Sequence, residues 1–323
     1  MQYEAELEQS LRYLGSDQAL QSLDADPYWP KWDSSWWHML LLHEMGLTKQ
    51  IPESVIERNV AVLDAFPLKI FPIHPEEIPK GIDYARMTLC HCYLGNVYQV
   101  LAACGVDVDS RLPWIRPWFL RYQMSDGGLT CDNDAYLVKD EVPSSMVGTI
   151  AAFEAVLLYT RRPWTTEETT FLQRGAQFLI GRKLMHGSST NHNADERMSA
   201  EKWTKLCFPR FYLYDVLRGL SALLAWAEKT NQPIPIDSVR DVVTHLDRHF
   251  PDGNVRIERQ SYEGVGTIRQ SASGEWVRRQ PATFFPLLNR VSVIGDVSPF
   301  LSGQWQAARA TIAARSDLKE LLQ

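Results

Sequence analysis

The sequence predicts an all-α protein in which two kinds of helix alternate around a closed ring. Segments of the first kind, such as residues 166–181 and 239–250, carry apolar residues at the helical period on one side only. Segments of the second kind, such as residues 145–159 and 211–227, are apolar on nearly every side. Because a helix without a polar face must be surrounded by protein, the second kind predicts an inner layer and the first an outer one.

The inner segments recur about every 50–70 residues, which indicates stacked helical hairpins, five or six in number. They begin near Ser35, Tyr84, Ser145, Phe211 and Phe284. We favour a closed α/α toroid over an open solenoid, because these segments are too apolar to line a solvated concave face. No shift in composition marks a linker, so we predict a single domain over residues 1–323.

Local signals support the individual elements. Thr165 and Glu168 have the spacing of a capping box ahead of 166–181, and Asp237 stands where the N-cap of the 239–250 helix is expected. A further one-sided helix covers residues 3–14. Residues 252–280 break the pattern, since they are rich in Gly, Ser and Arg with short alternating runs, and they predict a small β-hairpin excursion.

Composition excludes several classes of function. The net charge of −6 argues against a nucleic-acid surface, which would need a basic face. No window approaches the roughly 18 consecutive apolar residues of a membrane span. The acidic N-terminus lacks the layout of a signal peptide and the five cysteines form no disulfide framework, so we expect a cytoplasmic protein with reduced thiols.

One block of the chain resembles a known family. Residues 117–158, PWFLRYQMSDGGLTCDNDAYLVKDEVPSSMVGTIAAFEAVLL, are similar to a repeat of the squalene–hopene cyclases and prenyltransferases, in which a Gln ends an outer helix, a DGGW or DGGL turn follows, and a Ser/Thr-rich start opens the next inner helix. The matching parts here are Gln123, Asp126-Gly127-Gly128-Leu129, and Ser144-Ser145 with Thr149. The resemblance implies the α/α toroid of terpenoid cyclases and protein prenyltransferase β subunits.

The catalytic signatures of those families are missing. The sequence contains no two adjacent Asp residues, so it has neither the Asp-x-Asp-Asp acid of class II cyclases nor the Asp-Asp-x-x-Asp motif of class I enzymes. Asp132-Asn133-Asp134 is the nearest approach. The Asp-x-Cys zinc pair of the prenyltransferases is also absent. The resemblance therefore implies a fold and does not carry an activity with it.

Cysteine and histidine offer a candidate metal site. Cys90, His91 and Cys131 are the candidate ligands, because thiolate and imidazole bind zinc well. Adjacent residues on a helix point about 100° apart, so at most two of Cys90, His91 and Cys92 can share one ion. No zinc-binding spacing is present, and we favour core thiols with one hydrogen-bonded histidine over a zinc cofactor.

Four polar residues are candidates for acid–base chemistry. Asp132 and Asp134 belong to an acidic loop before an inner segment, although solvated loop charges are the simpler interpretation. His192 lies in a polar loop and can exchange a proton near pH 7, although such residues commonly lie at the surface. Asp215 and Arg218, spaced i, i+3 in an apolar segment, either brace neighbouring helices or face a cavity.

Aromatic and basic residues are the candidates for ligand binding. Two of the arginines belong to the hairpin excursion, which could close over the ring and hold an anionic head group, with solvated charges as the default. The full candidate set is His91, Trp203, Tyr212, Tyr214, Arg218, Arg256 and Arg259.

Three functions fit these observations. The leading hypothesis is a protein that binds or transforms an apolar, isoprenoid-like small molecule, with or without an anionic head, in a central aromatic cavity. The second is a carbohydrate-active (α/α)-barrel enzyme, which would use paired carboxylates. The third is a non-catalytic binding or scaffold protein. A dry aromatic cavity favours the first, two facing acids the second, and a filled cavity the third.

Overall fold

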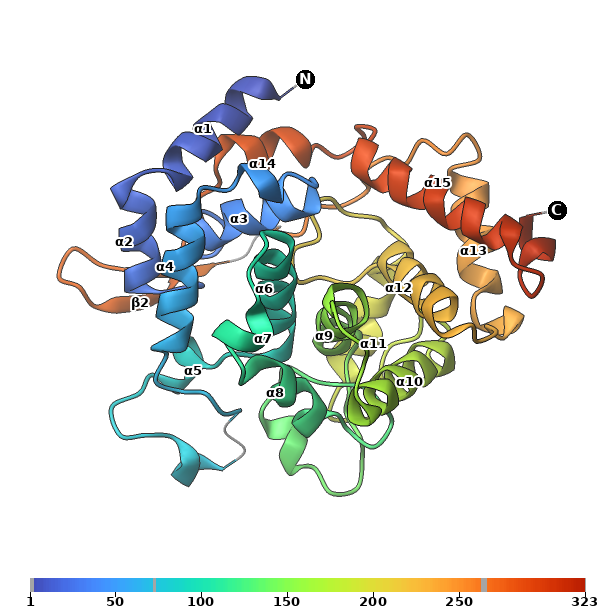
Figure 1. The fold of residues 1–323 in the computed structure, drawn as a ribbon, viewed down its shortest axis with the longest axis horizontal. Helices are drawn as coiled ribbons and strands as arrows, with labels where there is room; N and C mark the ends of the chain where they lie inside the picture. The colour runs from blue at the N-terminus through green and yellow to red at the C-terminus, as the bar shows by residue number, and fades with distance from the viewer. Residues whose placement is uncertain (1–2, 72–73, 263–265, 323) are drawn as a thin grey trace.

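The computed structural model describes residues 3–71, 74–262 and 266–322, and this part of the chain is mostly helical (Figure 1). Among these residues a single two-stranded antiparallel sheet interrupts the helices. The predictions of a mostly helical chain and of a small β-hairpin are confirmed. Within the described ranges, no helix combines the length and apolar character that crossing a membrane requires.

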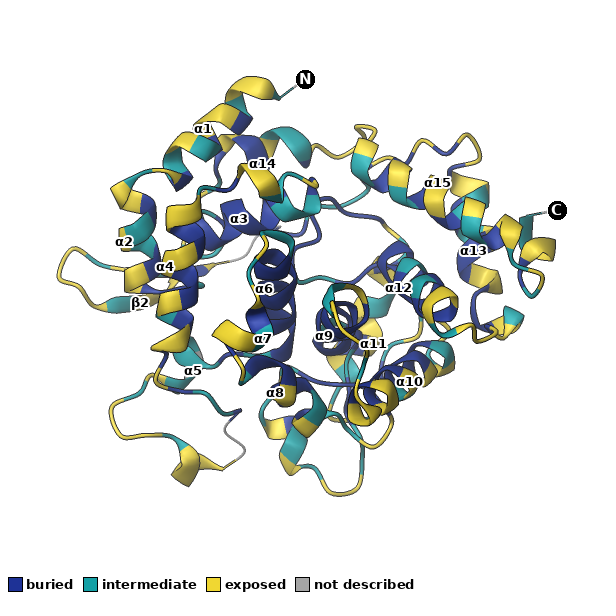
Figure 2. Cartoon of the chain, viewed as in Figure 1, coloured by how far each residue is buried: buried dark blue, intermediate teal, exposed yellow. Residues whose placement is uncertain are grey.

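The longer helices fall into the two predicted kinds. The buried ones are α3 (Ser35–Glu44), α6 (His91–Ala103), α9 (Met146–Tyr159) and α12 (Val216–Thr230). Those with an exposed side are α1 (Glu4–Leu14), α2 (Asp17–Ala25), α4 (Glu53–Asp64), α8 (Ile115–Tyr122), α10 (Thr166–Gly181), α13 (Arg240–His249) and α15 (Pro299–Ala314). In Figure 2, α6 and α9 are buried over most of their surface, whereas α1, α10 and α15 each carry an exposed stripe.

Shorter elements connect these helices. The short α-helices are α5 (Tyr84–Met87), α7 (Val108–Arg111), α11 (Ala194–Ser199) and α14 (Pro286–Val291). The 3-10 turns are η1 (Thr48–Gln50), η2 (Pro75–Glu77), η3 (Asp134–Leu137), η4 (Ala200–Lys202), η5 (Ile236–Ser238) and η6 (Lys319–Leu322). The hairpin consists of β1 (Thr267–Gln270) and β2 (Trp276–Gln280), and residues 263–265 of the predicted excursion lie outside the described ranges.

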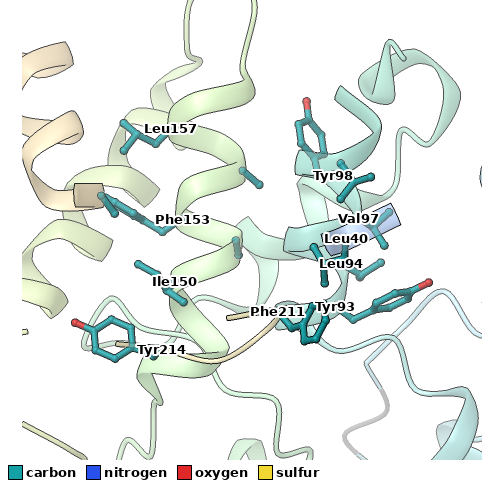
Figure 3. Packing of buried hydrophobic residues seen from close by; sticks show 14 of the residues in the cluster. Leu40, Tyr93, Leu94, Val97, Tyr98, Ile150, Phe153, Leu157, Phe211 and Tyr214 are labelled. Carbon is teal, nitrogen blue, oxygen red and sulfur yellow. The ribbon is translucent and has the colours of Figure 1, made fainter. Parts of the chain in front are cut away.

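The buried helices contact one another in chain order. α3 packs on α6, α6 on α9, α9 on α12, and α12 on α15, while α14 packs on α1 near the start of the chain. The outer helices cover this series, with α10 against both α9 and α12, and α13 against α12. Figure 3 shows the core between them: Leu94 and Val97 of α6 lie beside Leu40 of α3, whereas Phe153 of α9 points away from α6.

The closest approach is between α6 and α9. A Cβ at Gly95 would lie 2.5 Å from the backbone nitrogen of Ala152 and would also meet the backbone of Ala151. Glycine is therefore required at this crossing. The short distance lets Gln99 on α6 donate to the carbonyl oxygen of Ala151 at 2.9 Å and to the carboxylate of Glu154 at 3.2 Å. The helix crossing thus positions the polar side chains described below.

The DGGL turn fits tightly between α8 and α10. Gly127 has a φ of +93°, and a Cβ there would lie 2.6 Å from the carbonyl carbon of Arg174 on α10, so only glycine fits. Asp126 accepts the N–H of Gly128 at 3.1 Å, and Leu129 forms a β-bridge with Ser145. The turn therefore fixes the position of the next residues, Thr130 and Cys131.

Three predicted boundaries were wrong. The inner segment predicted to begin near Tyr84 is not one helix, because the chain is extended at Thr88 and Cys90 between α5 and α6. The helix predicted from Phe211 begins at Val216, because Phe211 has a φ of +54°. Asp237 lies in η5 and does not cap α13. By contrast, the capping box of Thr165 and Glu168 is confirmed.

Candidate functional site

A pocket of about 260 Å³ lies where the buried helices meet α15. Its lining comes from α3, α6 and α9, from the loop and first turn of α12, and from the first turns of α15. The apolar lining residues are Leu40, Phe208, Phe211, Phe300 and Leu301. The polar lining residues are His43, Glu44, Asn96, Gln99, Glu154, Arg210, Arg218 and Gln304. We call this the central pocket.

A buried ion pair forms one wall of the central pocket. Arg218 Nη2 lies 2.6 Å from Glu154 Oε2, and Nε lies 3.0 and 3.1 Å from the two carboxylate oxygens. Arg218 also donates to the carbonyl oxygens of Phe211 and Leu213 at 3.2 and 2.9 Å. Burial disfavours the guanidinium charge, but Glu154 outweighs it and raises the pKa of Arg218. Both side chains are therefore held in a fixed geometry.

Glu44, at the last position of α3, is an acidic residue of this pocket with a shifted pKa. Its carboxylate accepts the backbone N–H of Arg210 at 2.7 Å and of Phe211 at 2.6 Å, so it stabilises the loop that contains the positive φ of Phe211. Burial raises the pKa of Glu44 to about 7, although these N–H groups and the nearby arginines oppose the shift. Glu44 therefore changes its charge near neutral pH.

His43 and Arg210 complete the charge arrangement. Burial lowers the pKa of His43 to about 4, so its imidazole is neutral at pH 7. Arg210 donates from Nε to Asp215 at 2.6 Å, and its buried Nη2 has no hydrogen-bond partner among the described residues. Arg210 is therefore a lining residue whose guanidinium is held in place by Asp215.

An aromatic wall adjoins the polar groups. The rings of Phe208 and Phe300 stack with their centroids 4.5 Å apart and an interplanar angle of 13°, and both line the central pocket. Phe208 precedes the loop of Arg210, and Phe300 lies in the first turn of α15. The pocket thus combines an apolar surface with hydrogen-bonding groups, which is the usual composition of a small-molecule site.

Asp215 and Arg218 do not pair through their side chains. Asp215 is the N-cap of α12 and accepts the backbone N–H of Arg218 at 2.8 Å, while its carboxylate pairs with Arg210. It is fully buried and does not line the pocket. Of these two candidates, Arg218 alone belongs to the lining, and Asp215 positions Arg210 from behind it.

The aromatic candidates lie outside the central pocket. Tyr214 is buried, donates to the carbonyl oxygen of Leu184 at 2.7 Å and packs edge-on against Trp203. Tyr212 accepts a hydrogen bond from Lys31 Nζ at 3.2 Å and stacks on Trp32. None of the three candidates, Trp203, Tyr212 and Tyr214, lines the central pocket.

The loop candidates come together, but at the surface. His192 Nε2 lies 2.7 Å from Asp132 Oδ2, and Asp134 donates its backbone N–H to the other oxygen of Asp132 at 3.0 Å. The Asp132 side chain is 54 % exposed. The pair is therefore partly open to water, and neither residue lines the central pocket.

Arg256 and Arg259, which precede the hairpin in the predicted excursion, bind backbone carbonyl groups. Arg256 donates to Gly295 at 2.8 Å, and Arg259 donates to Lys205 and Tyr214, each at 2.8 Å. Neither lines the central pocket. The hairpin itself docks on the loop of residues 26–33, where Thr267 Oγ1 accepts the N–H of Lys31 at 2.7 Å. The hairpin, which we predicted could close over the ring, therefore lies against this loop and does not line the central pocket.

Of the three candidate metal ligands, the His91 ring does not join the two cysteines. His91 is fully buried and donates from Nδ1 to the carbonyl oxygen of Thr130 at 2.7 Å, with its ring among Phe71, Tyr122 and Tyr136. Burial lowers the pKa of His91 to about 4. Cys90 and Cys131 instead lie together, with Cys92 as the third member of their group.

Sequence reasoning missed Glu44, Gln99 and Arg210 as lining residues. Glu154 had a visible signal, because it is one of two polar interruptions in the apolar segment 145–159. Glu44 follows a run of apolar residues at the end of α3 and carries no motif.

Comparison with protein-family models, with curated proteins and with solved structures gives no match.

Proposed function

We propose that the chain forms an α/α toroid whose central pocket binds a small polar molecule, with Glu44 as the group that exchanges a proton. Three observations support the ring. The buried helices contact in order from α3 to α12 and on to α15, five helices contribute to one pocket, and α14 returns the chain to α1. This arrangement agrees with the resemblance of residues 117–158 to cyclase and prenyltransferase repeats.

The size and polarity of the pocket support a small ligand. Pockets for drug-sized molecules measure about 300–1,000 Å³, so a volume of about 260 Å³ suits a molecule of monosaccharide or amino-acid size. The lining offers an amide from Asn96, an imidazole from His43 and an apolar surface from Phe208 and Phe300. An isoprenoid chain would need a longer and more apolar cavity, so we favour the polar ligand.

The raised pKa of Glu44 carries the proposed role. A general acid or base works best when its pKa lies near the working pH, and burial raises the pKa of Glu44 to about 7. His43 beside it is neutral at that pH and can give or accept a hydrogen bond. Glu44 would hold a proton on a ligand hydroxyl or carboxyl group, or transfer it.

Glycoside chemistry is a second candidate. Glycosidases use two carboxyl groups, one with a raised pKa as acid and one that stays ionised. Glu44 and Glu154 both line the pocket, Glu44 has the raised pKa, and Glu154 is paired with Arg218. An aromatic wall next to these acids would stack against a sugar ring.

Native mass spectrometry of protein purified from its host tests the proposal. We expect one bound polar molecule per chain, which can then be identified and added back. Gln304→Trp should fill the pocket from α15 and abolish binding. Gln306→Trp, on an exposed face of the same helix, is the matched control and should bind normally.

Two results would overturn the proposal. The first is a bound molecule whose affinity is the same in wild type and Gln304→Trp, because that ligand would lie elsewhere. The second is the absence of any bound molecule together with no response, in thermal unfolding, to a panel of monosaccharides, polyols and amino acids. An apolar co-purified molecule that Gln304→Trp displaces would favour the isoprenoid-like alternative.

A further inference from the structure

Three thiols converge at the N-terminus of α6. The sulfur atoms of Cys90, Cys92 and Cys131 all lie within 4.8 Å of one another, and those of Cys90 and Cys92 are 3.3 Å apart. The expected separation of two sulfurs on one zinc ion is about 3.8 Å, given tetrahedral Zn–S bonds of about 2.3 Å. The spacing of the three thiols therefore already approximates that of a three-thiolate metal site.

The fold holds this geometry from two sides. Cys90 is the N-cap of α6 and has an extended backbone. The rotation of about 100° between successive side chains of a helix therefore does not apply to it, and its thiol can lie close to that of Cys92. Cys131 follows the DGGL turn, and His91 fixes that loop through its hydrogen bond to the Thr130 carbonyl oxygen. The backbone N–H of Cys92 then donates to Cys131 Sγ at 3.4 Å. His91 is thus a positioning residue.

Positively charged groups lie near the three sulfurs. A helix N-terminus and its free N–H groups stabilise thiolates. Lys31 adds a positive charge beside Cys90 and Cys131, and its ammonium group lies 5.4 Å from the ring centre of Tyr28 and 4.6 Å from that of Tyr212. Three thiolates and one divalent ion carry a net charge of −1, which the single charge of Lys31 offsets.

We propose that Cys90, Cys92 and Cys131 bind a thiophilic metal ion, Zn²⁺, with the fourth coordination position open to an adjacent pocket. Cys90 and Cys131 line a pocket of about 210 Å³, which we call the thiol pocket, together with Tyr28, Lys31 and Arg86. Among the described residues, no fourth Cys, His or carboxylate joins the three thiols. Three protein ligands and one open position are the pattern of catalytic zinc.

The β-hairpin borders this pocket. Trp276 of β2 lies over the guanidinium of Arg86, with 4.6 Å from that group to the ring centre, and Arg278 pairs with Asp83 at 3.1 Å. Arg86 in turn pairs with Asp26, which also lines the pocket. The hairpin thus shields one side of the thiol pocket. This inference is independent of the function proposed for the central pocket.

Metal binding can be measured on the full chain purified under reducing, anaerobic conditions. We expect one Zn²⁺ per chain by elemental mass spectrometry after zinc addition and desalting. Co²⁺ in its place should give sulfur-to-cobalt charge-transfer absorption. Cys131→Ser should lower zinc affinity by more than about 100-fold, because even loss of an outer-shell partner costs 10–100-fold.

Cys104→Ser is the matched control. Cys104 is the C-cap at the opposite end of α6, where its thiol contacts the carbonyl oxygen of Thr48. This variant should bind zinc as the wild type does. If Cys131→Ser does not fold, alkylation of the wild type gives the same test, because zinc should protect the partly exposed Cys90 and Cys131 and leave Cys104 reactive.

Several outcomes would overturn the assignment. These are a chain that binds no stoichiometric zinc or cobalt, equal loss of affinity in Cys104→Ser and Cys131→Ser, no protection from alkylation, and a Cys90–Cys92 disulfide in anaerobically purified protein. The open position has its own test. Added imidazole should change the cobalt spectrum, and an unchanged spectrum would show that the fourth position is closed.

Discussion

The central pocket and the thiol pocket are built in different ways. The charged groups of the central pocket are largely paired within the protein: Arg218 with Glu154, Arg210 with Asp215, and Glu44 with two backbone N–H groups. At the second pocket, which Cys90 and Cys131 line, the three clustered thiols contact one another and the backbone N–H of Cys92. Charges that are already paired give a rigid, pre-organised cavity, whereas clustered thiols provide ligands for an ion.

The difference predicts that the central pocket is important for folding stability. Arg218→Met should lower the free energy of unfolding by about 3–5 kcal/mol, because it leaves Glu154 buried without its partner. Denaturant unfolding followed by circular dichroism measures this loss. The control is Arg111→Met, which removes an exposed pair with Glu57 and should cost at most about 1 kcal/mol. Equal effects of the two variants would contradict the comparison.

Glu44 predicts how the stability of the central pocket depends on pH. Its pKa of about 7 in the folded state lies above the ordinary value of 4.5, so between these pH values the native chain holds a proton that the unfolded chain has released. The stabilisation is present in full below pH 4.5 and is lost as the pH rises through 7. From pH 5 to pH 8 the wild type should lose about 2.5 kcal/mol more than Glu44→Gln.

Denaturant unfolding of both proteins at the two pH values provides this difference. The buried histidines contribute equally to wild type and variant, so they cancel. Glu44→Gln also weakens one of the two backbone hydrogen bonds, but that loss is common to both pH values. A difference that stays constant with pH would show that Glu44 is ionised throughout.

The helix crossing behind the central pocket gives the next largest effect. Gly95→Ala should destabilise the protein by about 1–3 kcal/mol, because the new Cβ meets the backbone of Ala151 and Ala152. Gly303→Ala on α15 is the matched control. A Cβ there meets nothing within 4 Å, so alanine should stabilise that helix by about 0.5–1 kcal/mol. Two thermal unfolding curves that shift in the same direction would argue against the close crossing.

The exposed pair of His192 and Asp132 gives the smallest effect. His192→Ala should change stability by less than about 1 kcal/mol, because an exposed ion pair contributes little. It should also leave ligand binding to the central pocket unchanged. Calorimetric titration of the identified ligand into wild type and variant measures this. A large loss of affinity would show that His192 contributes to ligand binding.

Local chemistry was sufficient to predict much of the fold. Apolar residues at the helical period predicted α1, α10 and α13, and Thr165 with Glu168 predicted the start of α10. These signals are readable because each depends on residues within one or two helical turns. The boundaries failed where distant residues decide them. Glu44 accepts the N–H groups of Arg210 and Phe211, and this contact between α3 and a loop far along the chain is compatible with the later start of α12.

The two pockets needed the tertiary structure. Glu44, Glu154 and Arg210 carry no shared motif, and it is the packing of the buried helices that brings them to one pocket. The spacing of Cys90, Cys92 and Cys131 matches no zinc pattern, yet an extended N-cap and the DGGL turn bring their sulfurs together. The sequence by itself determined the alternation of helices and the chemistry available. Only tertiary packing decided which groups meet, because contacts between distant segments depend on how whole helices cross.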